Sequence, residues 1–166
     1  AKSRRTGVDV EMNYDFGMAG GHTNLRLVGT RLLEAREWEF QDFPNEYKER
    51  SNYVTNPRWR GQFTAKYTLN NFRASWDMVY IHKNLRVFPE SYNTNPGSQR
   101  PIWNPSMTYH NLQIGYTMAD SGVEVYLGVD NVFDKNPPVN YFGSDLGSAY
   151  YDNIGRFMYM GVNYKF

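Results

Sequence analysis

Apolar and polar residues alternate along much of this chain, with the period of two that is typical of β-strands. The clearest example lies near the N-terminus, over residues 6–18. Its apolar set is Val8, Val10, Met12, Tyr14 and Phe16, and its polar set is Asp9, Glu11, Asn13 and Asp15. The first set predicts a face that avoids water. The acidic set would be costly against lipid and suits a wet lumen.

The same alternation predicts six further strands. They cover residues 22–33, 59–69, 72–80, 107–118, 123–130 and 155–166. Gly20 and Gly21 mark one tight turn between neighbouring strands, and Asn70 and Asn71 mark another. The charged stretch 32–39 is also compatible with a short helical piece. The pattern therefore predicts an all-β chain of seven antiparallel strands in meander order.

The connections between these strands alternate between short and long. Short ones lie near residues 20, 70 and 120, and long ones begin near residues 34, 82 and 134. Outer-membrane barrels have short turns at the periplasmic side and longer loops outside the cell. A soluble meander has no reason to keep all its long loops at one end. This alternation of short and long connections therefore favours a membrane barrel and predicts that the C-terminus lies at the periplasmic side.

Composition taken alone favours a different interpretation. Aromatic residues make up 17% of the chain, which suits the aromatic girdles of a membrane barrel but also a soluble β-sandwich or lipocalin-like barrel. Most alternating sheets belong to soluble proteins. Mean hydropathy is −0.71, but a barrel strand shows lipid only every second residue. The alternation of loop lengths is the observation that reverses the compositional preference.

The residue inventory argues against several kinds of site. The chain has no cysteine, so disulfides and thiolate metal ligands are excluded. A net charge of +1 does not indicate the strongly basic surface that is typical of proteins that bind nucleic acid. The three histidines share no metal-ligand spacing, no nucleophile-elbow pattern frames a serine, and Asp145 and Asp152 suit solvated loop positions. We therefore expect no catalytic residue, no metal and no cofactor.

The C-terminal quarter carries two recognisable motifs. Residues 131–138 read Asn-Val-Phe-Asp-Lys-Asn-Pro-Pro, and a Gly-Arg pair at 155–156 then opens an aromatic strand that ends in Phe166. This order resembles the C-terminus of TonB-dependent outer-membrane receptors. The last residues resemble the signal that the barrel assembly machinery reads. Its members here are Gly161, Val162, Tyr164 and Phe166.

This resemblance implies a barrel of about 22 strands with a plug in its lumen, in the bacterial outer membrane. The seven strands would be the last third of the wall, because an open edge in hydrocarbon leaves unpaired backbone groups. The plug, the first strands and the segment that contacts TonB would precede Ala1. The implied partners are outer-membrane lipid, the rest of the barrel and plug, the TonB complex, the assembly machinery and a small-molecule substrate.

The implied function is the import of a scarce solute from the cell surface to the periplasm. Family resemblance allows ferric siderophores, haem, cobalamin, metal chelates or oligosaccharides. Two alternatives stay open: a passive porin or structural barrel, and an outer-membrane barrel enzyme with catalytic residues at its rim. The segment shows no evident catalytic set, and a plug with a TonB-contact motif upstream would exclude the porin.

Aromatic residues in the long loops are the candidates for substrate contact. Flat, amphipathic rings stack on sugars or aromatic ligands and anchor binding sites. The candidates are Trp38, Tyr47, Tyr92, Trp103, Tyr141, Phe142, Tyr150 and Tyr151. Basic residues are also present, but acidic ones lie among them, so a uniformly basic funnel for anionic chelates is not expected.

The alternation also predicts which residues face lipid near the end of the chain. Leu127 and Gly128 are adjacent, so their side-chain directions oppose. An arginine at Leu127 should cost about 2–4 kcal/mol near the bilayer midplane, and an arginine at Gly128 should cost less because it would enter the lumen.

Overall fold

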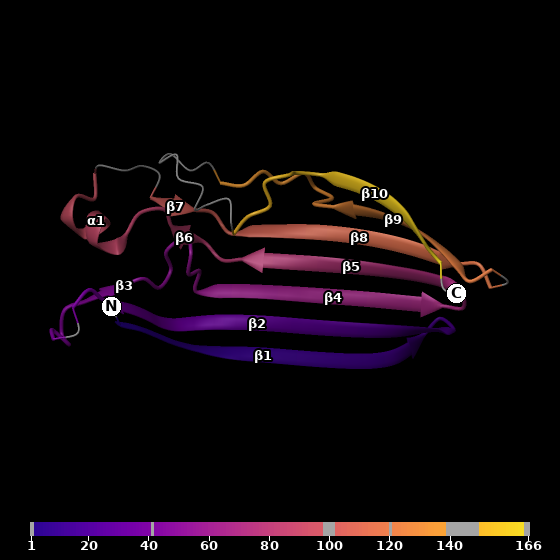
Figure 1. Cartoon of the computed structure of the whole chain (residues 1–166), viewed down its shortest axis with the longest axis horizontal. Coiled ribbons are helices and arrows are strands. Elements are labelled where there is room, and N and C mark those ends of the chain that lie inside the picture. The colour runs from indigo at the N-terminus through magenta and orange to yellow at the C-terminus, as the bar shows by residue number, and fades with distance from the viewer. Residues whose placement is uncertain (1, 41, 98–101, 120, 139–149, 165–166) are drawn as a thin grey trace.

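Seven long strands form one curved antiparallel sheet in the computed structural model, which describes residues 2–40, 42–97, 102–119, 121–138 and 150–164 (Figure 1). They are β1 (Lys2–Met18), β2 (Gly21–Trp38), β4 (Trp59–Leu69), β5 (Phe72–Ile81), β8 (Met107–Thr117), β9 (Val123–Asp130) and β10 (Phe157–Tyr164). Each strand pairs with the neighbour that precedes or follows it in this order. The predicted all-β antiparallel meander is therefore confirmed.

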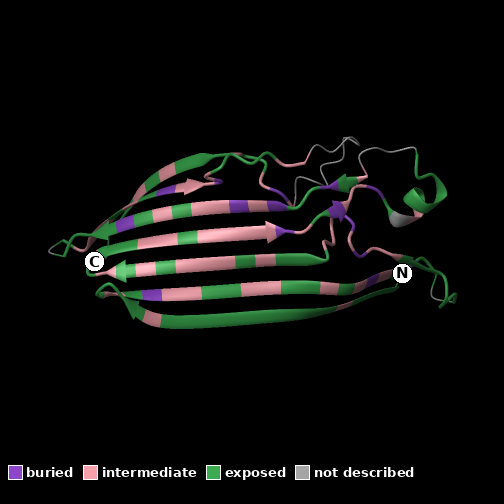
Figure 2. Ribbon diagram, turned by 180° about the vertical axis from the view of Figure 1, so that it is seen from behind, coloured by how far each residue is buried: buried purple, intermediate pink, exposed green. Residues whose placement is uncertain are grey.

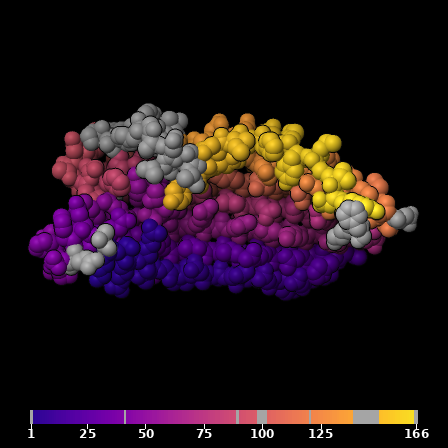
Figure 3. All heavy atoms as spheres, viewed as in Figure 1, coloured from indigo at the N-terminus to yellow at the C-terminus, as the bar shows by residue number. Residues whose placement is uncertain are grey.

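The remaining elements are short and lie in the long connections. β3 (Tyr47–Glu49) pairs with the end of β2, and β6 (Asn84–Leu85) pairs with β7 (Trp103–Asn104). The helix α1 spans Pro89–Thr94. All four lie at one end of the sheet, which we call the loop end; the opposite end, with the tight turns, is the turn end (Figure 1). In the space-filling view the same loops extend beyond the body of the sheet (Figure 3).

The second strand is longer than the alternation indicates: the loop expected from residue 34 begins only after Trp38, and the possible helical piece at 32–39 is not present. β2 continues to Trp38, pairing with the start of β1 on one side and with β3 on the other. A bulge explains the weak pattern: Gly7 pairs with Leu32 and Thr6 with Glu34, which leaves Leu33 as an extra residue. An extra residue shifts the phase of the alternation. A helix here would leave the first residues of β1 without backbone partners.

The registers sort the side chains into two faces, because residues directly opposite each other share a face. One row across the sheet reads Tyr14, Leu25, Ala65, Trp76, Leu112, Val129 and Met158. The adjacent row reads Asp15, Asn24, Lys66, Ser75, Gln113, Gly128 and Tyr159. We call these the apolar face and the polar face. The assignment of the two sets in β1 agrees with the prediction from sequence.

The apolar face is uncovered. Val8, Leu127 and Val162 are 50%, 51% and 65% exposed, and nearly all of β1 is exposed (Figure 2). In a two-sheet sandwich these side chains would form the dry core between the sheets. Soluble monomers rarely expose apolar patches larger than a few hundred Å². The structure therefore excludes the sandwich that composition alone favoured.

The polar face carries charge pairs and hydrogen bonds between strands. Arg26 Nε lies 2.9 Å from Glu11 Oε1, and Thr64 Oγ1 donates to Asp77 Oδ1 at 2.6 Å. Arg73 Nη2 lies 2.7 Å from Glu124 Oε1, a pair that links β5 to β9. Such pairs contribute little each when exposed. Their importance here is that they satisfy charges on a face that cannot meet lipid.

The sheet does not close on itself. Within the described residues, β1 pairs only with β2, and β10 pairs only with β9 along its length. The expected open edges are thus confirmed, and β1 does not pair with β10 as it would in a small closed barrel. The architecture is that of a partial β-barrel wall.

Two tyrosines lie over glycines on the polar face of the last hairpin. Tyr159 is opposite Gly128, and Tyr126 is opposite Gly161. A Cβ added to either glycine would overlap the ring of the opposing tyrosine. This packing corrects the comparison of Leu127 with Gly128: an arginine at Gly128 would have to displace Tyr159, so its cost would not report on lumen exposure.

We therefore predict that Leu127→Arg destabilises the intact receptor by about 2–4 kcal/mol, because the charge enters hydrocarbon. Gln62→Arg is the matched control, since Gln62 is exposed on the polar face of β4, away from Tyr159. It should change the free energy of unfolding much less. The measurement is urea unfolding of the full receptor refolded in bilayers, and equal losses for the two variants would contradict the assigned faces.

Candidate functional site

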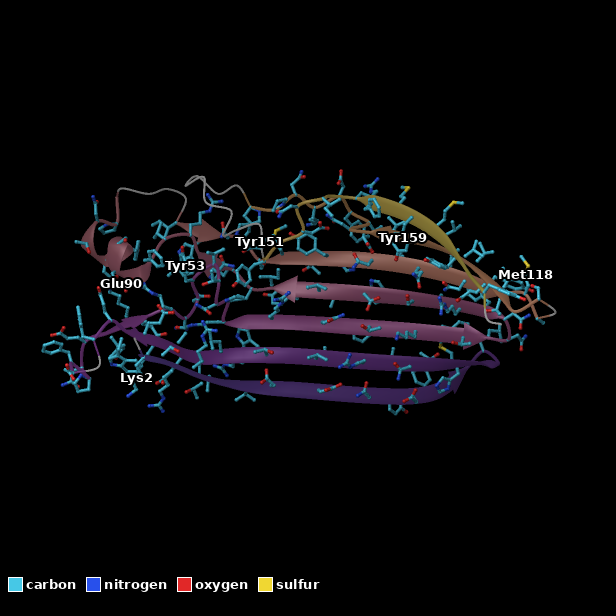
Figure 4. The ribbon with its side chains drawn as sticks, viewed as in Figure 1. Lys2, Tyr53, Glu90, Met118, Tyr151 and Tyr159 are labelled. Atoms are coloured by element: carbon cyan, nitrogen blue, oxygen red, sulfur yellow. The ribbon has the colours of Figure 1, made fainter. Side chains whose placement is uncertain are left out.

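The polar face changes character as it approaches the loop end. Its rows become apolar there, with Ile81 on β5 and Met107 and Tyr109 on β8, all at most 8% exposed. These side chains pack with Tyr53, Val54 and Tyr151, which come from two of the long connections. Tyr53 and Tyr151 lie close to the loop end of the sheet, whereas Met118 marks the turn end (Figure 4). This cluster is the only hydrophobic core of buried residues in the described part of the chain, and it holds the loops onto the polar face.

A buried polar network joins two of the long connections. Asn84, at 0% exposure, donates from Nδ2 to the Tyr151 hydroxyl at 2.6 Å. Asn104 Nδ2 donates to Asn84 Oδ1 at 2.8 Å, and Arg86 Nε donates to Asn104 Oδ1 at 2.6 Å. Burial raises the pKa of the Tyr151 phenol above its ordinary value. A buried polar network specifies one arrangement only when its members are satisfied, so the loops are held in a defined relation.

The first long connection is attached by its own contacts. Trp38 is buried at the end of β2, and its Nε1 donates to the Pro44 carbonyl at 2.8 Å. Glu49 accepts from the backbone N–H groups of Ala35 and Ser51 at 3.0 and 2.9 Å. Burial raises the pKa of Glu49, but these donors outweigh it and hold the pKa below its ordinary value.

This connection also meets α1. Arg50 Nη1 lies 2.6 Å from Glu90 Oε2, and the Arg50 guanidinium lies 4.4 Å from the centre of the Phe88 ring. Glu90 sits on α1 at the far side of the loop end (Figure 4). The three long connections are therefore interlocked: the first with the second through Arg50, and the second with the third through Asn84.

A cavity of about 370 Å³ lies on the polar face below these loops. Its polar lining comprises Arg60, Asn111, Asp130, Tyr150, Tyr151 and Asp152. Two carboxylates thus share the space with one guanidinium and three tyrosines, since Tyr109 also lines the cavity. The volume falls in the range of roughly 300–1,000 Å³ that is typical of small-molecule sites, and the lining offers rings for stacking and charged groups for orientation.

The structure distributes the eight predicted contact residues over separate places. Trp38 and Tyr47 have ring centres 5.8 Å apart at the end of β2, and Tyr92 and Trp103 are exposed on α1 and β7. Tyr150 and Tyr151 come together in the lining of the cavity. Tyr141 and Phe142 lie outside the described residues. Trp38 and Tyr151 are buried, so their rings pack against neighbouring residues.

Sequence reasoning missed Asn84, Asn104 and Tyr109, which organise this region. One signal in the sequence indicated this region. Val79 and Ile81 are apolar, although the preceding residues on the same face of β5, Ser75 and Asp77, are polar. An interruption of that kind on a wet face indicates something packed against it. The buried asparagines gave no such signal, because asparagine is common in exposed loops.

The motif at 131–138 is a turn that closes against the start of the last strand. Asn131 is fully buried, donates from Nδ2 to the Lys135 carbonyl at 3.0 Å and accepts from the Lys135 N–H at 2.9 Å. Asp134 Oδ1 accepts from the Arg156 N–H at 2.9 Å, and Arg156 Nε donates to the Val132 carbonyl at 3.0 Å. The motif therefore ends β9 and fixes where the third loop returns to β10.

Gly155 completes this closure. Its φ is +79°, and a Cβ added there would lie 3.0 Å from Asp134 Oδ1. Glycine adopts this left-handed conformation at no steric cost. Of the assembly-signal residues, Val162 and Tyr164 are exposed on the apolar face, Gly161 lies under Tyr126, and Phe166 is outside the described residues.

Among the described residues, no cluster of three or more histidines and carboxylates has the arrangement of a metal site. The described chain also contains no helix with the length and apolarity required to cross a membrane.

An antiparallel meander with an exposed apolar face, a charged opposite face and interlocked loops at one end defines a wall of an outer-membrane β-barrel. The chain belongs to the TonB dependent receptor-like, beta-barrel family, whose profile matches residues 1–132. Members of this family are receptors and transporters of the bacterial outer membrane and are not enzymes. The match ends within the motif at 131–138, so β10 lies beyond it.

The comparison with curated proteins found no match, and the comparison with solved structures found none either. The family assignment therefore specifies the class of protein, an outer-membrane receptor that acts together with TonB. It does not specify a substrate.

We predict that Asn84→Leu loosens the second and third loops. The substitution removes the hydrogen bonds that Asn84 makes with the Tyr151 hydroxyl and the Asn104 amide, and a buried unsatisfied group costs about 1–3 kcal/mol. Limited proteolysis of the full receptor in outer membranes should then cleave residues 82–106 faster. Asn93→Leu, at an exposed position on α1, is the control and should leave the cleavage rate unchanged. Equal rates for wild type and Asn84→Leu would show that the network does not hold the loops.

Proposed function

We propose that the protein is a TonB-dependent receptor that binds a scarce solute at the cell surface and imports it into the periplasm. The observation that carries this proposal is the cavity beneath three interlocked loops on the polar face of a barrel wall of this family. A wet, structured pocket at the loop end is where a solute would be captured. The turn end has only tight connections in the described residues.

In this proposal the seven strands are the last part of a barrel of about 22 strands. Their polar face lines the lumen against a plug, and the first strands of the barrel pair with the open edges of β1 and β10. Pairing is required because each unsatisfied backbone group in hydrocarbon costs several kcal/mol. The plug and a TonB-contacting segment belong to the part of the receptor that precedes these strands, and the barrel assembly machinery reads the C-terminal signal.

The loop end faces the outside of the cell, so the C-terminus lies at the periplasmic side. This orientation follows from the convention that outer-membrane barrels keep short turns at the periplasm. It is supported by the tight turns, which the described residues place at one end only.

The proposed substrate contacts are the rings exposed at the loop end and those of the cavity. Tyr150 is the strongest candidate, because it lines the cavity and is only partly buried. Trp38, Tyr47, Tyr92, Trp103, Tyr141, Phe142 and Tyr151 remain further candidates. The mixed charge of Arg60, Asp130 and Asp152 favours a substrate that carries both donors and acceptors over a simple polyanion. Ferric siderophores, haem, cobalamin, metal chelates and oligosaccharides are all within this description.

We further propose that the receptor is not an enzyme and not a passive porin. The family consists of receptors driven through TonB, which disfavours passive diffusion. A rim enzyme needs a nucleophile with a neighbouring base. The described loop residues offer hydrogen-bonded asparagines and tyrosines instead.

The orientation is tested by cysteine labelling of intact cells, in a receptor without other cysteines. Asn93→Cys at the loop end should react with a membrane-impermeant maleimide, whereas Asn71→Cys at the turn end should react only after the outer membrane is permeabilised. Asn93 is exposed and Asn71 partly exposed, so labelling after permeabilisation serves as the measure of each cysteine's intrinsic reactivity. Labelling of Asn71→Cys alone in intact cells would reverse the proposed orientation.

The transport function is tested with a panel of radiolabelled substrates from the five classes above. We expect one class to enter cells in a TonB-dependent manner. Tyr150→Ala should weaken binding of that substrate by about fivefold or more, the effect of losing a contact worth about 1 kcal/mol. Tyr116→Ala, on the apolar face, should leave the affinity unchanged. Uptake that persists without TonB would identify a passive porin.

A further inference from the structure

The apolar face contains a groove that no described residue fills. Gly29 on β2 pairs with Gly61 on β4, and Val10 and Tyr80 flank them in the same row. Two neighbouring strands thus lack side chains at the same level. The resulting groove has a volume of about 750 Å³, and its walls include Val8, Leu27, Leu33 and Trp59.

These glycines do not relieve any crowding. A Cβ added at Gly29 would meet no atom within 4 Å, and one added at Gly61 would meet only the Val28 carbonyl oxygen at 3.6 Å. Neither glycine has the left-handed backbone that would exclude other residues. Gly128 and Gly161 differ in this respect, because tyrosine rings occupy the space above them. The groove therefore exists because its glycines leave it open.

One end of the groove is cationic. Arg31 lies there with its guanidinium 5.0 Å from the centre of the Trp59 ring, and it makes no ion pair with any described carboxylate. His82 lies beside it, with Nδ1 2.9 Å from the Tyr80 hydroxyl. No aspartate or glutamate lines the groove. A weakly hydrated guanidinium that stacks on an aromatic ring remains free to contact a phosphate through its N–H groups.

We propose that this groove binds one lipid of the outer leaflet that carries a phosphate headgroup. An acyl chain lies along Gly29 and Gly61, and the phosphate meets Arg31 at the loop end. The assignment to the outer leaflet rests on the orientation proposed above. The groove is apolar along its length and cationic at one end only, which is the complement of an anionic amphiphile.

A lipid explains these features better than a protein partner does. The apolar face meets hydrocarbon, so any occupant must come from within the bilayer, where lipid is the solvent. A membrane partner would contact the outer rims of the groove, such as Val8 and Leu27, and would not require the floor to be open. The charge at Arg31 would also be costly beneath a protein without an acidic group to match it.

The binding is tested by native mass spectrometry of the full receptor, purified in mild detergent. The probes are dioleoyl phosphatidic acid and dioleoyl phosphatidylcholine, which have the same chains but different headgroups. Wild type should retain one phosphatidic acid molecule after extensive delipidation. Gly29→Ile places a side chain on the floor of the groove and should lose the lipid, whereas Ala74→Ile places the same side chain elsewhere on the apolar face and should keep it.

The headgroup contact is tested separately, so that the result does not depend on how Gly29→Ile folds. Arg31→Gln should reduce the preference for phosphatidic acid over phosphatidylcholine by about fivefold, the effect expected of one arginine at a membrane surface. Lys66→Gln removes a positive charge from the polar face and should change nothing. A Gly29→Ile variant that keeps the lipid, an Arg31→Gln variant with unchanged preference, or a bound mass equal to a second copy or another protein would each overturn the proposal.

The proposal and the transport function fail in distinguishable ways. Lipid retention is measured on purified receptor and needs neither substrate nor TonB. Loss of TonB-dependent uptake would therefore leave the lipid result standing, and absence of the lipid with intact uptake would reject the groove alone. Cysteine labelling that places the loop end in the periplasm would overturn the assignment to the outer leaflet.

Discussion

The pairing of every backbone N–H and C=O group is the constraint on which this structure depends. In hydrocarbon no water can replace a missing partner, so a strand there needs a neighbour on both sides. Five of the seven long strands have two such neighbours in the described sheet, while β1 and β10 have one each. The bulge at Leu33 follows the same rule, since it lets β2 stay paired with β1 while a residue is added. The open edges of β1 and β10 are the places where the wall must continue.

The second constraint is that each strand has two unlike environments. Alternate residues face either lipid or a wet lumen. The apolar face is therefore not covered by other parts of the described chain, and the polar face carries ion pairs such as that of Glu11 with Arg26. Where the polar face turns apolar, at Ile81 and Tyr109, loops from far along the chain cover it. The same change of character that builds a small core also creates the cavity next to it. The small core and the candidate binding cavity therefore lie together at the loop end, because both depend on the loops that cover this part of the polar face.

Glycines on the two faces serve opposite purposes. On the polar face, Gly128 and Gly161 accept tyrosine rings and tighten the last hairpin. On the apolar face, Gly29 and Gly61 leave a space that the described protein does not fill. The residue type is the same, and the difference lies entirely in what the opposing strand presents. Glycine in a strand weakens it unless something packs close to the backbone, so each pair indicates a specific neighbour.

The sequence by itself determined the seven long strands except for the end of β2, their order, the two faces and the end at which the long loops gather. These features depend on residues close together in the chain, as in the alternation of Val8 to Phe16. The C-terminal motif was also readable, and Asn131, Asp134 and Arg156 now explain it as a turn closure. Only the tertiary structure decided which side chains meet across strands and loops. It extended β2 to Trp38, buried Tyr151 against Asn84 and placed Tyr159 over Gly128. The physical reason is that register and loop packing join residues far apart in sequence, and a local pattern carries no information about such partners.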